Sequence, residues 1–179
     1  MKEQTTGFVP LKPTSQEVRD FLEQEPAADW KRSLLFLLDR FPQIRDGKTE
    51  YLIEGGAAVA LLGHPRGKAP KDIDLLTSRP DLPAAFQNSE KFDVKTVEHW
   101  FEERGLTYTP ERGAFLLGSS ETVQHEGVNV LVLSPVLLAC SKLLEFRGRK
   151  PRLQDQNDVS FLGASPEDIH AAMERLGAL

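Results

Sequence analysis

The chain has 179 residues, of which 40% are hydrophobic and 27% are charged, and its formal net charge at pH 7 is −5. This composition is ordinary for a soluble globular protein with one sizeable core, and the acidic balance excludes a protein that is basic over its whole surface. Because no apolar run approaches the roughly 20 residues of a membrane-spanning helix, we expect a protein of the cytoplasm or nucleus without a membrane segment.

The first part of the chain predicts two helices. Residues 1–13 contain a glycine and two prolines, and we expect them to form an irregular lead-in. Thr14–Glu17 has the pattern of a capping box, which predicts that a helix begins there. Apolar residues at helical spacing predict a second helix over residues 28–41, which Pro42 ends.

The next segment predicts a strand, a tight turn and a helix. Residues 51–53 form the strand, Gly55-Gly56 the turn, and the alanine-rich residues 57–62 a buried helix. The stretch 63–71 is rich in glycine, proline and positive charge, which predicts a loop. This loop leads into a strand at residues 72–77.

Further along the chain, residues 79–90 predict a turn with a short helix. Asp93 is expected to cap the N-terminus of a helix that continues to residue 104, where Gly105 stops it. Four short apolar segments then predict antiparallel strands of the same sheet. These segments are residues 106–109, 114–118, 122–125 and 128–133.

The C-terminal part predicts three helices. Ser134-Pro135 opens the first, which carries the single cysteine, Cys140, among leucines and therefore as a buried residue. The second is expected at residues 155–162, and Ser165-Pro166 opens the third.

We accordingly expect an α/β core at residues 14–134, with a mixed sheet flanked by helices, and a C-terminal helical segment at residues 135–179 that packs on it. Positive side chains lie within and after the first C-terminal helix, and they form either a phosphate or polynucleotide surface or a solvated helix end. They are Lys142, Arg147, Arg149, Lys150 and Arg152.

The paired acids of Asp72-Ile73-Asp74-Leu75 carry the clearest chemical signal. Successive side chains of a strand point to opposite faces, so Asp72 and Asp74 share one face. Mg²⁺ takes oxygen ligands and keeps water and substrate phosphate in its shell, so two carboxylates are enough protein ligands for one ion. Gly55-Gly56 lacks side chains and lets a phosphate approach the backbone N–H groups of the following helix.

These residues resemble the signature of the nucleotidyltransferase superfamily. That signature is a hydrophobic residue with Gly-Gly or Gly-Ser, a spacer, and then two aspartates that alternate with hydrophobic residues. Here it corresponds to Ile53–Gly56 and Asp72–Leu75. The spacer, with Arg66 shortly before the aspartates, is similar to that of the bacterial abortive-infection and type IV toxin-antitoxin nucleotidyltransferases.

The resemblance implies a role for each matching position. Gly55 and Gly56 would contact a triphosphate, while Asp72 and Asp74 would bind Mg²⁺ and so carry the catalysis. Phosphate would also be touched by positive side chains, for which the candidates are Arg66, Lys71 and Lys142.

Members of the superfamily usually place a third carboxylate on a later strand. The corresponding segment here, Gly127–Leu133, offers Asn129, whose amide cannot accept a proton as a base. Glu54, Glu121 and Glu126 are the alternatives, and the sequence selects none of them.

The expected activity is Mg²⁺-dependent transfer of a nucleoside monophosphate from a nucleoside triphosphate to a hydroxyl of RNA, a protein or a small molecule. Two other functions stay open. The chain could be a catalytically silent member that binds a nucleotide or RNA, for which the missing third acid is the main argument. It could also be a structural or interaction protein whose acids and bases are ordinary surface residues.

Overall fold

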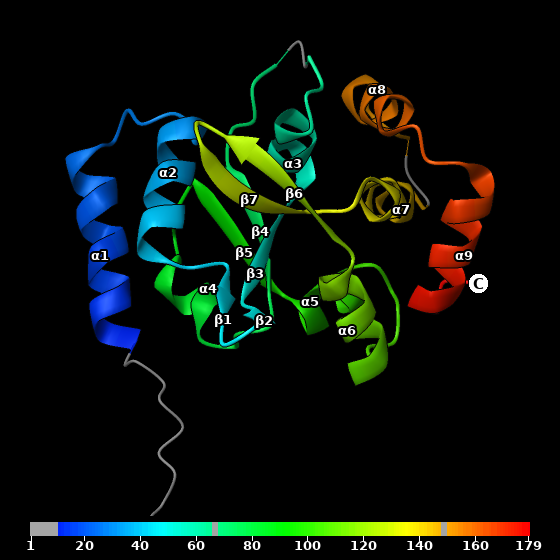
Figure 1. Cartoon of the computed structure of the whole chain (residues 1–179), viewed down its shortest axis with the longest axis horizontal. Helices are drawn as coiled ribbons and strands as arrows, with labels where there is room; N and C mark the ends of the chain where they lie inside the picture. Colours follow the sequence, from blue (N-terminus) through cyan, green and yellow to red (C-terminus); the bar gives the residue numbers. More distant parts are fainter. Residues whose placement is uncertain (1–10, 66–67, 148–149) are drawn as a thin grey trace, which may run out of the picture.

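The computed structural model describes residues 11–65, 68–147 and 150–179, which form a mixed α/β fold (Figure 1). A five-stranded mixed sheet with the order β5-β4-β3-β7-β6 runs through the middle, with helices on both sides. The predicted fold class is therefore confirmed. The strands are β3 Tyr51–Glu54, β4 Ile73–Thr77, β5 Phe92–Thr96, β6 Ser120–His125 and β7 Val128–Leu133, and a separate two-stranded ribbon pairs β1 Ile44–Arg45 with β2 Lys48–Thr49.

The pairing pattern places β4 between two strands. It runs antiparallel to β3 and parallel to β5. On the other side of β3, β7 pairs in parallel and β6 follows antiparallel to β7. The strand that carries the predicted acid pair therefore has a neighbour on each edge.

Aromatic side chains fill the core on one face of the sheet. This face is covered by α1 Leu11–Gln24, α2 Trp30–Arg40 and α4 Leu82–Ala85. Phe21 and Phe36 stack with their ring centroids 4.1 Å apart, and Phe92 of β5 packs against both rings and against Phe86. Since α1 begins at Leu11, the predicted helix start at Thr14–Glu17 was wrong by about one turn.

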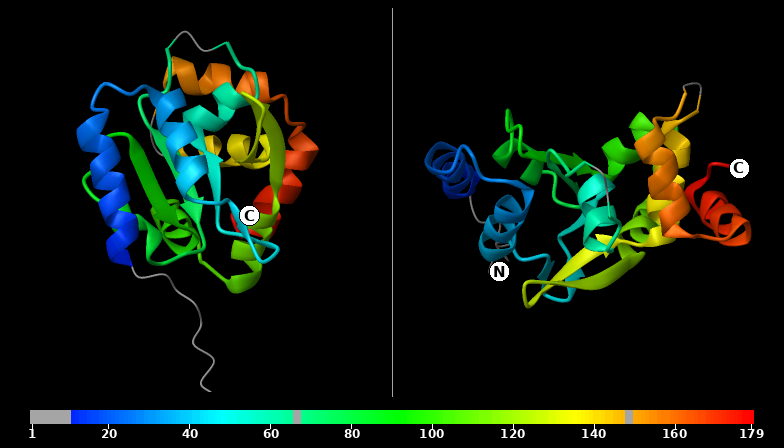
Figure 2. Two further views of the ribbon diagram at one scale, coloured as in Figure 1. Left: turned by 60° about the vertical axis from the view of Figure 1, so that its left-hand side comes forward. Right: turned by 90° about the horizontal axis from the view of Figure 1, so that it is seen from above.

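The other helices lie towards the opposite side of the sheet, where α7, α8 and α9 pack together (Figure 2). Ser134 and Ser165 cap α7 and α9 by accepting hydrogen bonds from the backbone, as predicted. Cys140 is buried on α7, also as predicted, and burial raises the pKa of its thiol to about 11. The helices are α3 Gly55–Leu61, α5 Val97–Glu103, α6 Pro110–Gly118, α7 Pro135–Glu145, α8 Leu153–Leu162 and α9 Pro166–Leu176.

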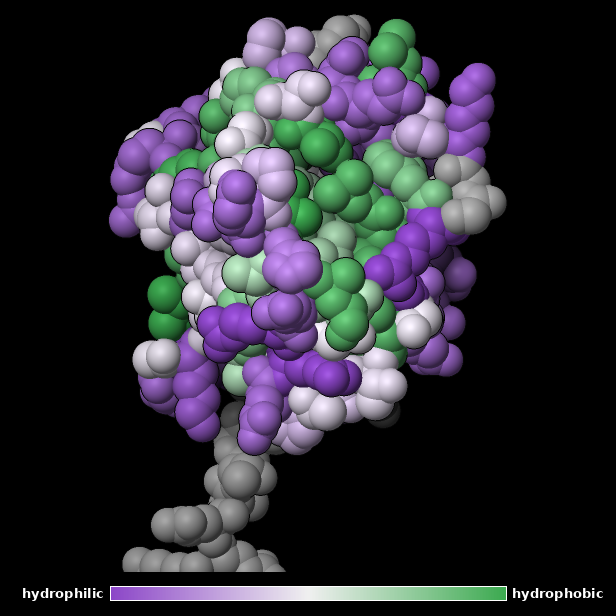
Figure 3. Space-filling model, turned by 90° about the vertical axis from the view of Figure 1, so that its right-hand side faces the viewer, coloured by the Kyte–Doolittle hydropathy of each residue, from purple (hydrophilic) through white to green (hydrophobic). Residues whose placement is uncertain are grey.

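Hydrophobic side chains lie between hydrophilic ones on the outer side of this helical group (Figure 3). Large exposed hydrophobic residues of these helices include Leu143 of α7 and Leu153 of α8. Within the described part of the chain, no helix is both long and apolar enough to cross a membrane.

Two further predictions of secondary structure were wrong. Residues 93–96 belong to β5 and residues 97–103 form α5, because Phe92-Asp93-Val94-Lys95 alternates apolar and charged residues and pairs with β4. The cap of α5 is Thr96, which accepts a hydrogen bond from the His99 backbone N–H. Residues 106–118 form a loop and α6 rather than two strands, because Thr109 caps a helix that starts with Pro110.

Candidate functional site

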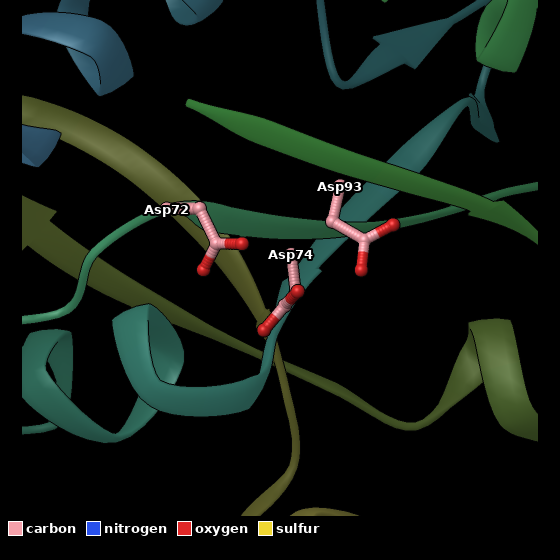
Figure 4. Close-up of side chains that lie close together, drawn as sticks. All are labelled: Asp72, Asp74 and Asp93. Carbon is pink, nitrogen blue, oxygen red and sulfur yellow. The ribbon is translucent and has the colours of Figure 1, made fainter. Parts of the chain in front are cut away.

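Acidic side chains from three neighbouring strands meet on one face of the sheet. Asp74 lies opposite Glu54 of β3 and opposite Asp93 of β5 in the strand register. Residues paired in this way across strands point to the same face, and Asp72 joins them from two positions before Asp74. One carboxylate oxygen from each of Asp72, Asp74 and Asp93 lies within 4.8 Å of the others. Figure 4 shows the three carboxylates turned towards the same side of the strands.

Asp93 is the residue that the sequence did not identify as part of the site. The strand expected to supply a third acid, β7, is separated from β4 by β3, so Asn129 lies away from the cluster. Glu121 and Glu126 lie on β6 and on the turn between β6 and β7, one strand further away. The alternation along β5 was the available signal, because it places Asp93 on the face opposite Phe92.

A glycine is needed where β3 turns into α3. Gly55 has φ = +62°, and a Cβ built at this position would overlap the Asp74 carboxylate. A side chain would therefore strain the backbone and displace a member of the acid cluster. This requirement explains the first glycine of Gly55-Gly56 without reference to any ligand.

A cavity of about 480 Å³ lies beside the acid cluster. Asp72, Asp74 and Glu54 belong to its wall on the sheet side, and residues of α7 and α8 form the wall that faces them. Positive side chains contribute from several elements. They are Lys68 and Lys71 of the loop before β4, Lys95 of β5, Lys142 of α7 and Arg152 at the start of α8.

Most of the residues predicted for the site lie together in this cavity. Gly55, Gly56, Lys71 and Lys142 line it together with Asp72 and Asp74. Arg66 falls outside the described residues. The contacts of these residues with a triphosphate stay predictions.

Lys142 is already engaged with two carboxylates. Its Nζ lies 3.0 Å from Asp155 Oδ1 and 3.1 Å from Asp158 Oδ2, and its side chain is 10% exposed. Arg152 also binds Asp155, at 2.7 Å. These ion pairs join α7 to α8. They also balance much of the positive charge that was predicted from the sequence to bind phosphate.

The acid cluster carries more negative charge than its surroundings balance. Burial, followed by the charges of Glu54, Asp72 and Asp93, raises the pKa of Asp74 to about 8. Burial and the Asp93 charge raise the pKa of Asp72, and burial raises that of Glu54. Lys95 is one of the nearby cations, with its Nζ 3.8 Å from Asp93 and 3.0 Å from Glu103. A cation bound between the aspartates would remove this imbalance.

The donor set suits a hard divalent cation. Three carboxylates offer oxygen ligands from two adjacent strands, and the neighbouring cavity leaves space for water or a further ligand on the ion. The chemistry of the cluster therefore fits Mg²⁺ or Mn²⁺ better than a soft metal, which would favour thiolate or imidazole ligands. The three aspartates could hold such an ion.

Among solved structures, the chain is similar to an antigenic nucleotidyltransferase-like protein from Paracoccidioides brasiliensis. The two are 19% identical, with a TM-score of 0.46, and the match covers 71% of this chain and 78% of that one. No family model and no curated protein match the chain. The chemistry of the site therefore has to follow from its own residues.

We predict that Gly55→Ala abolishes Mg²⁺ binding and lowers the free energy of unfolding by about 1–3 kcal/mol, because the added methyl group strains a left-handed backbone and displaces Asp74. Isothermal titration with Mg²⁺ and urea unfolding measure the two effects. Gly118→Ala is the matched control, since a Cβ there meets no atom within 4 Å. Unchanged Mg²⁺ binding in Gly55→Ala would contradict the assigned contact.

The raised pKa of Asp74 predicts how the stability of the metal-free protein depends on pH. Its pKa is about 8 in the folded state and near 3.8 in the unfolded chain, so between these values the folded protein holds a proton that the unfolded chain has released. Stability from this group is therefore present at low pH and is lost as pH rises towards 8. Asp74→Asn removes the titration and should stabilise the metal-free protein by about 1–3 kcal/mol near pH 8.5, with a smaller gain near pH 5.

Urea unfolding in EDTA across this pH range measures the difference between Asp74→Asn and the wild type. Mg²⁺ added at the upper end should stabilise the wild type and leave Asp74→Asn little changed. A difference that does not vary with pH would show that Asp74 is not crowded by its neighbours.

Proposed function

We propose that the protein is a divalent-metal-dependent nucleotidyltransferase, which moves a nucleoside monophosphate from a nucleoside triphosphate to a hydroxyl group. The observation that carries this proposal is the convergence of Asp72, Asp74 and Asp93 beside a cavity with positive side chains around it. A triphosphate with its metal ion carries both negative and positive charge. It is therefore complementary to a cavity whose walls carry both positive and negative side chains.

The residues of the site would hold the metal ion, bind the phosphates and accept the proton. Asp72, Asp74 and Asp93 would hold Mg²⁺, which when bound neutralises phosphate charge and polarises the phosphorus that is attacked. Lys71 and Lys95 would bind phosphate oxygens from the rim, and Gly55-Gly56 would leave room for the phosphates near the start of α3.

In the proposed reaction, the acceptor hydroxyl oxygen forms a bond to the α-phosphorus. The bond from that phosphorus to the oxygen that bridges to the β-phosphate breaks, and pyrophosphate leaves with its electron pair. We assign the uptake of the hydroxyl proton to Asp93, because it is the most exposed of the three aspartates. Most of the catalysis would come from positioning and charge.

Asp93 also bears on the alternative functions. The argument for a catalytically silent binder was the lack of a third carboxylate, and Asp93 supplies one. An interaction protein would have no use for a partly buried cluster of acids whose mutual repulsion opposes folding. The proposed acceptor is a hydroxyl of RNA, of a protein or of a small molecule, in the cytoplasm or the nucleus.

We predict that Asp93→Asn lowers the transfer rate at least about 100-fold, because an amide removes both a charge at the ion and the proton acceptor. Incubation with α-labelled nucleoside triphosphates and a panel of RNA, protein and small-molecule acceptors measures transfer of the label. Asp39→Asn is the control, since Asp39 lies exposed on α2.

Two outcomes would contradict this proposal. Wild-type protein that binds no nucleoside triphosphate in the presence of Mg²⁺ would exclude it. Label transfer that persists in Asp93→Asn and in Asp74→Asn would show that the label is moved elsewhere on the protein or by a contaminant.

A further inference from the structure

A buried glutamate lies next to the three aspartates. Glu54 is 4% exposed, and it pairs in register with Asp74 across the antiparallel edge of β3 and β4. Its Oε2 accepts a hydrogen bond of 3.1 Å from Trp100 Nε1, and both groups are buried. A carboxylate in this position is costly unless it is partnered, because it adds charge to a crowded cluster.

Trp100 in turn packs against a buried arginine. The Arg104 guanidinium lies 4.1 Å from the Trp100 ring centroid, and its Nη1 donates to the Trp100 carbonyl at 3.1 Å. Its Nη2 donates to Ser141 Oγ at 2.7 Å and to Glu145 Oε1 at 2.9 Å. The Arg104 side chain is only 3% exposed, so this stack is part of the interior.

These contacts connect the two sides of the cavity. Glu54 belongs to the sheet side, whereas Ser141 and Glu145 belong to the α7 wall that faces it. The indole of Trp100 lies between Glu54 and Arg104. Its N–H binds one carboxylate oxygen of Glu54 and so fixes the orientation of that carboxylate. Trp100 is fully buried, so a phenylalanine here would leave part of this space empty and would also remove the N–H donor.

We propose that Trp100 is a positioning residue, which holds Glu54 as a fourth carboxylate beside Asp74 and so strengthens the binding of a divalent cation by Asp72, Asp74 and Asp93. This inference deepens the proposed function and rests on it. Glu54 acts through its charge, which adds to the field at the ion from a site that water does not screen. Trp100 acts through the orientation of that charge.

The test is a titration with Mg²⁺ alone, without nucleotide. Glu54→Gln removes the charge, and Trp100→Phe removes the N–H donor together with part of the buried ring. Each should weaken Mg²⁺ affinity about tenfold, as substitutions of groups that orient metal ligands do. The double variant should be no weaker than the weaker single variant, because both changes remove the same interaction. Isothermal titration measures affinity, and circular dichroism checks that each variant is folded.

A spectroscopic readout tests the same contact in a protein that keeps it. In Trp30→Phe, Trp100 is the remaining tryptophan, and Trp30→Phe alone should bind Mg²⁺ like the wild type. Its emission should shift with Mg²⁺ and saturate at the affinity found by calorimetry, because the ion changes the charge near the indole. If Trp100→Phe does not fold, the Mg²⁺ affinity of Glu54→Gln and the emission of Trp30→Phe test the proposal.

Three results would overturn the inference. They are an affinity of Glu54→Gln or Trp100→Phe within about twofold of the wild type, fully additive effects in the double variant, and a Trp100 emission that Mg²⁺ leaves unchanged. A wild type that binds Mg²⁺ under these conditions keeps the proposed function standing even when the variants overturn the role of Trp100. Conversely, weakened Mg²⁺ binding in both variants supports that role even if no label is transferred.

Discussion

The register of β3, β4 and β5 places carboxylates side by side on one face of the sheet, and the rest of the site depends on the charge that they accumulate. Burial and neighbouring acids raise the pKa of Asp74 to about 8. Gly55 has to be a glycine because the Asp74 carboxylate occupies the space of a side chain. Lys95 offsets part of the charge, and a bound cation would offset the remainder.

The same strands serve two purposes through the alternation of their side chains. On β5, Phe92 enters the aromatic core beneath α1 and α2, while Asp93 faces the acid cluster on the other side. A large apolar face can support a small polar site whose formation opposes folding, because the two are carried by alternate residues. The α7 and α8 helices then close the cavity, and the ion pairs of Lys142 with Asp155 and Asp158 hold them together.

Local signals in the sequence were sufficient for part of the structure, although the cap of α6 at Thr109 was missed. The fold class, the strand with Asp72 and Asp74, and the caps at Ser134 and Ser165 follow from alternation and from side chains that bond the backbone. The third acid of the cluster did not follow, because Asp93 matches a helix cap as well as a strand and only the pairing with β4 decides between them. The hydrogen bond from Trp100 to Glu54 joins residues 46 positions apart, which no local pattern encodes.

The central claim is that three aspartates from two adjacent strands form one divalent-cation site beside a nucleotide-binding cavity. The most direct measurement is anomalous diffraction from crystals grown with Mn²⁺ and a non-hydrolysable nucleoside triphosphate. The account predicts an anomalous peak within about 2.5 Å of oxygens of Asp72, Asp74 and Asp93, with the triphosphate contacting the ion from the cavity side. An ion bound elsewhere, or a triphosphate remote from these aspartates, would contradict it.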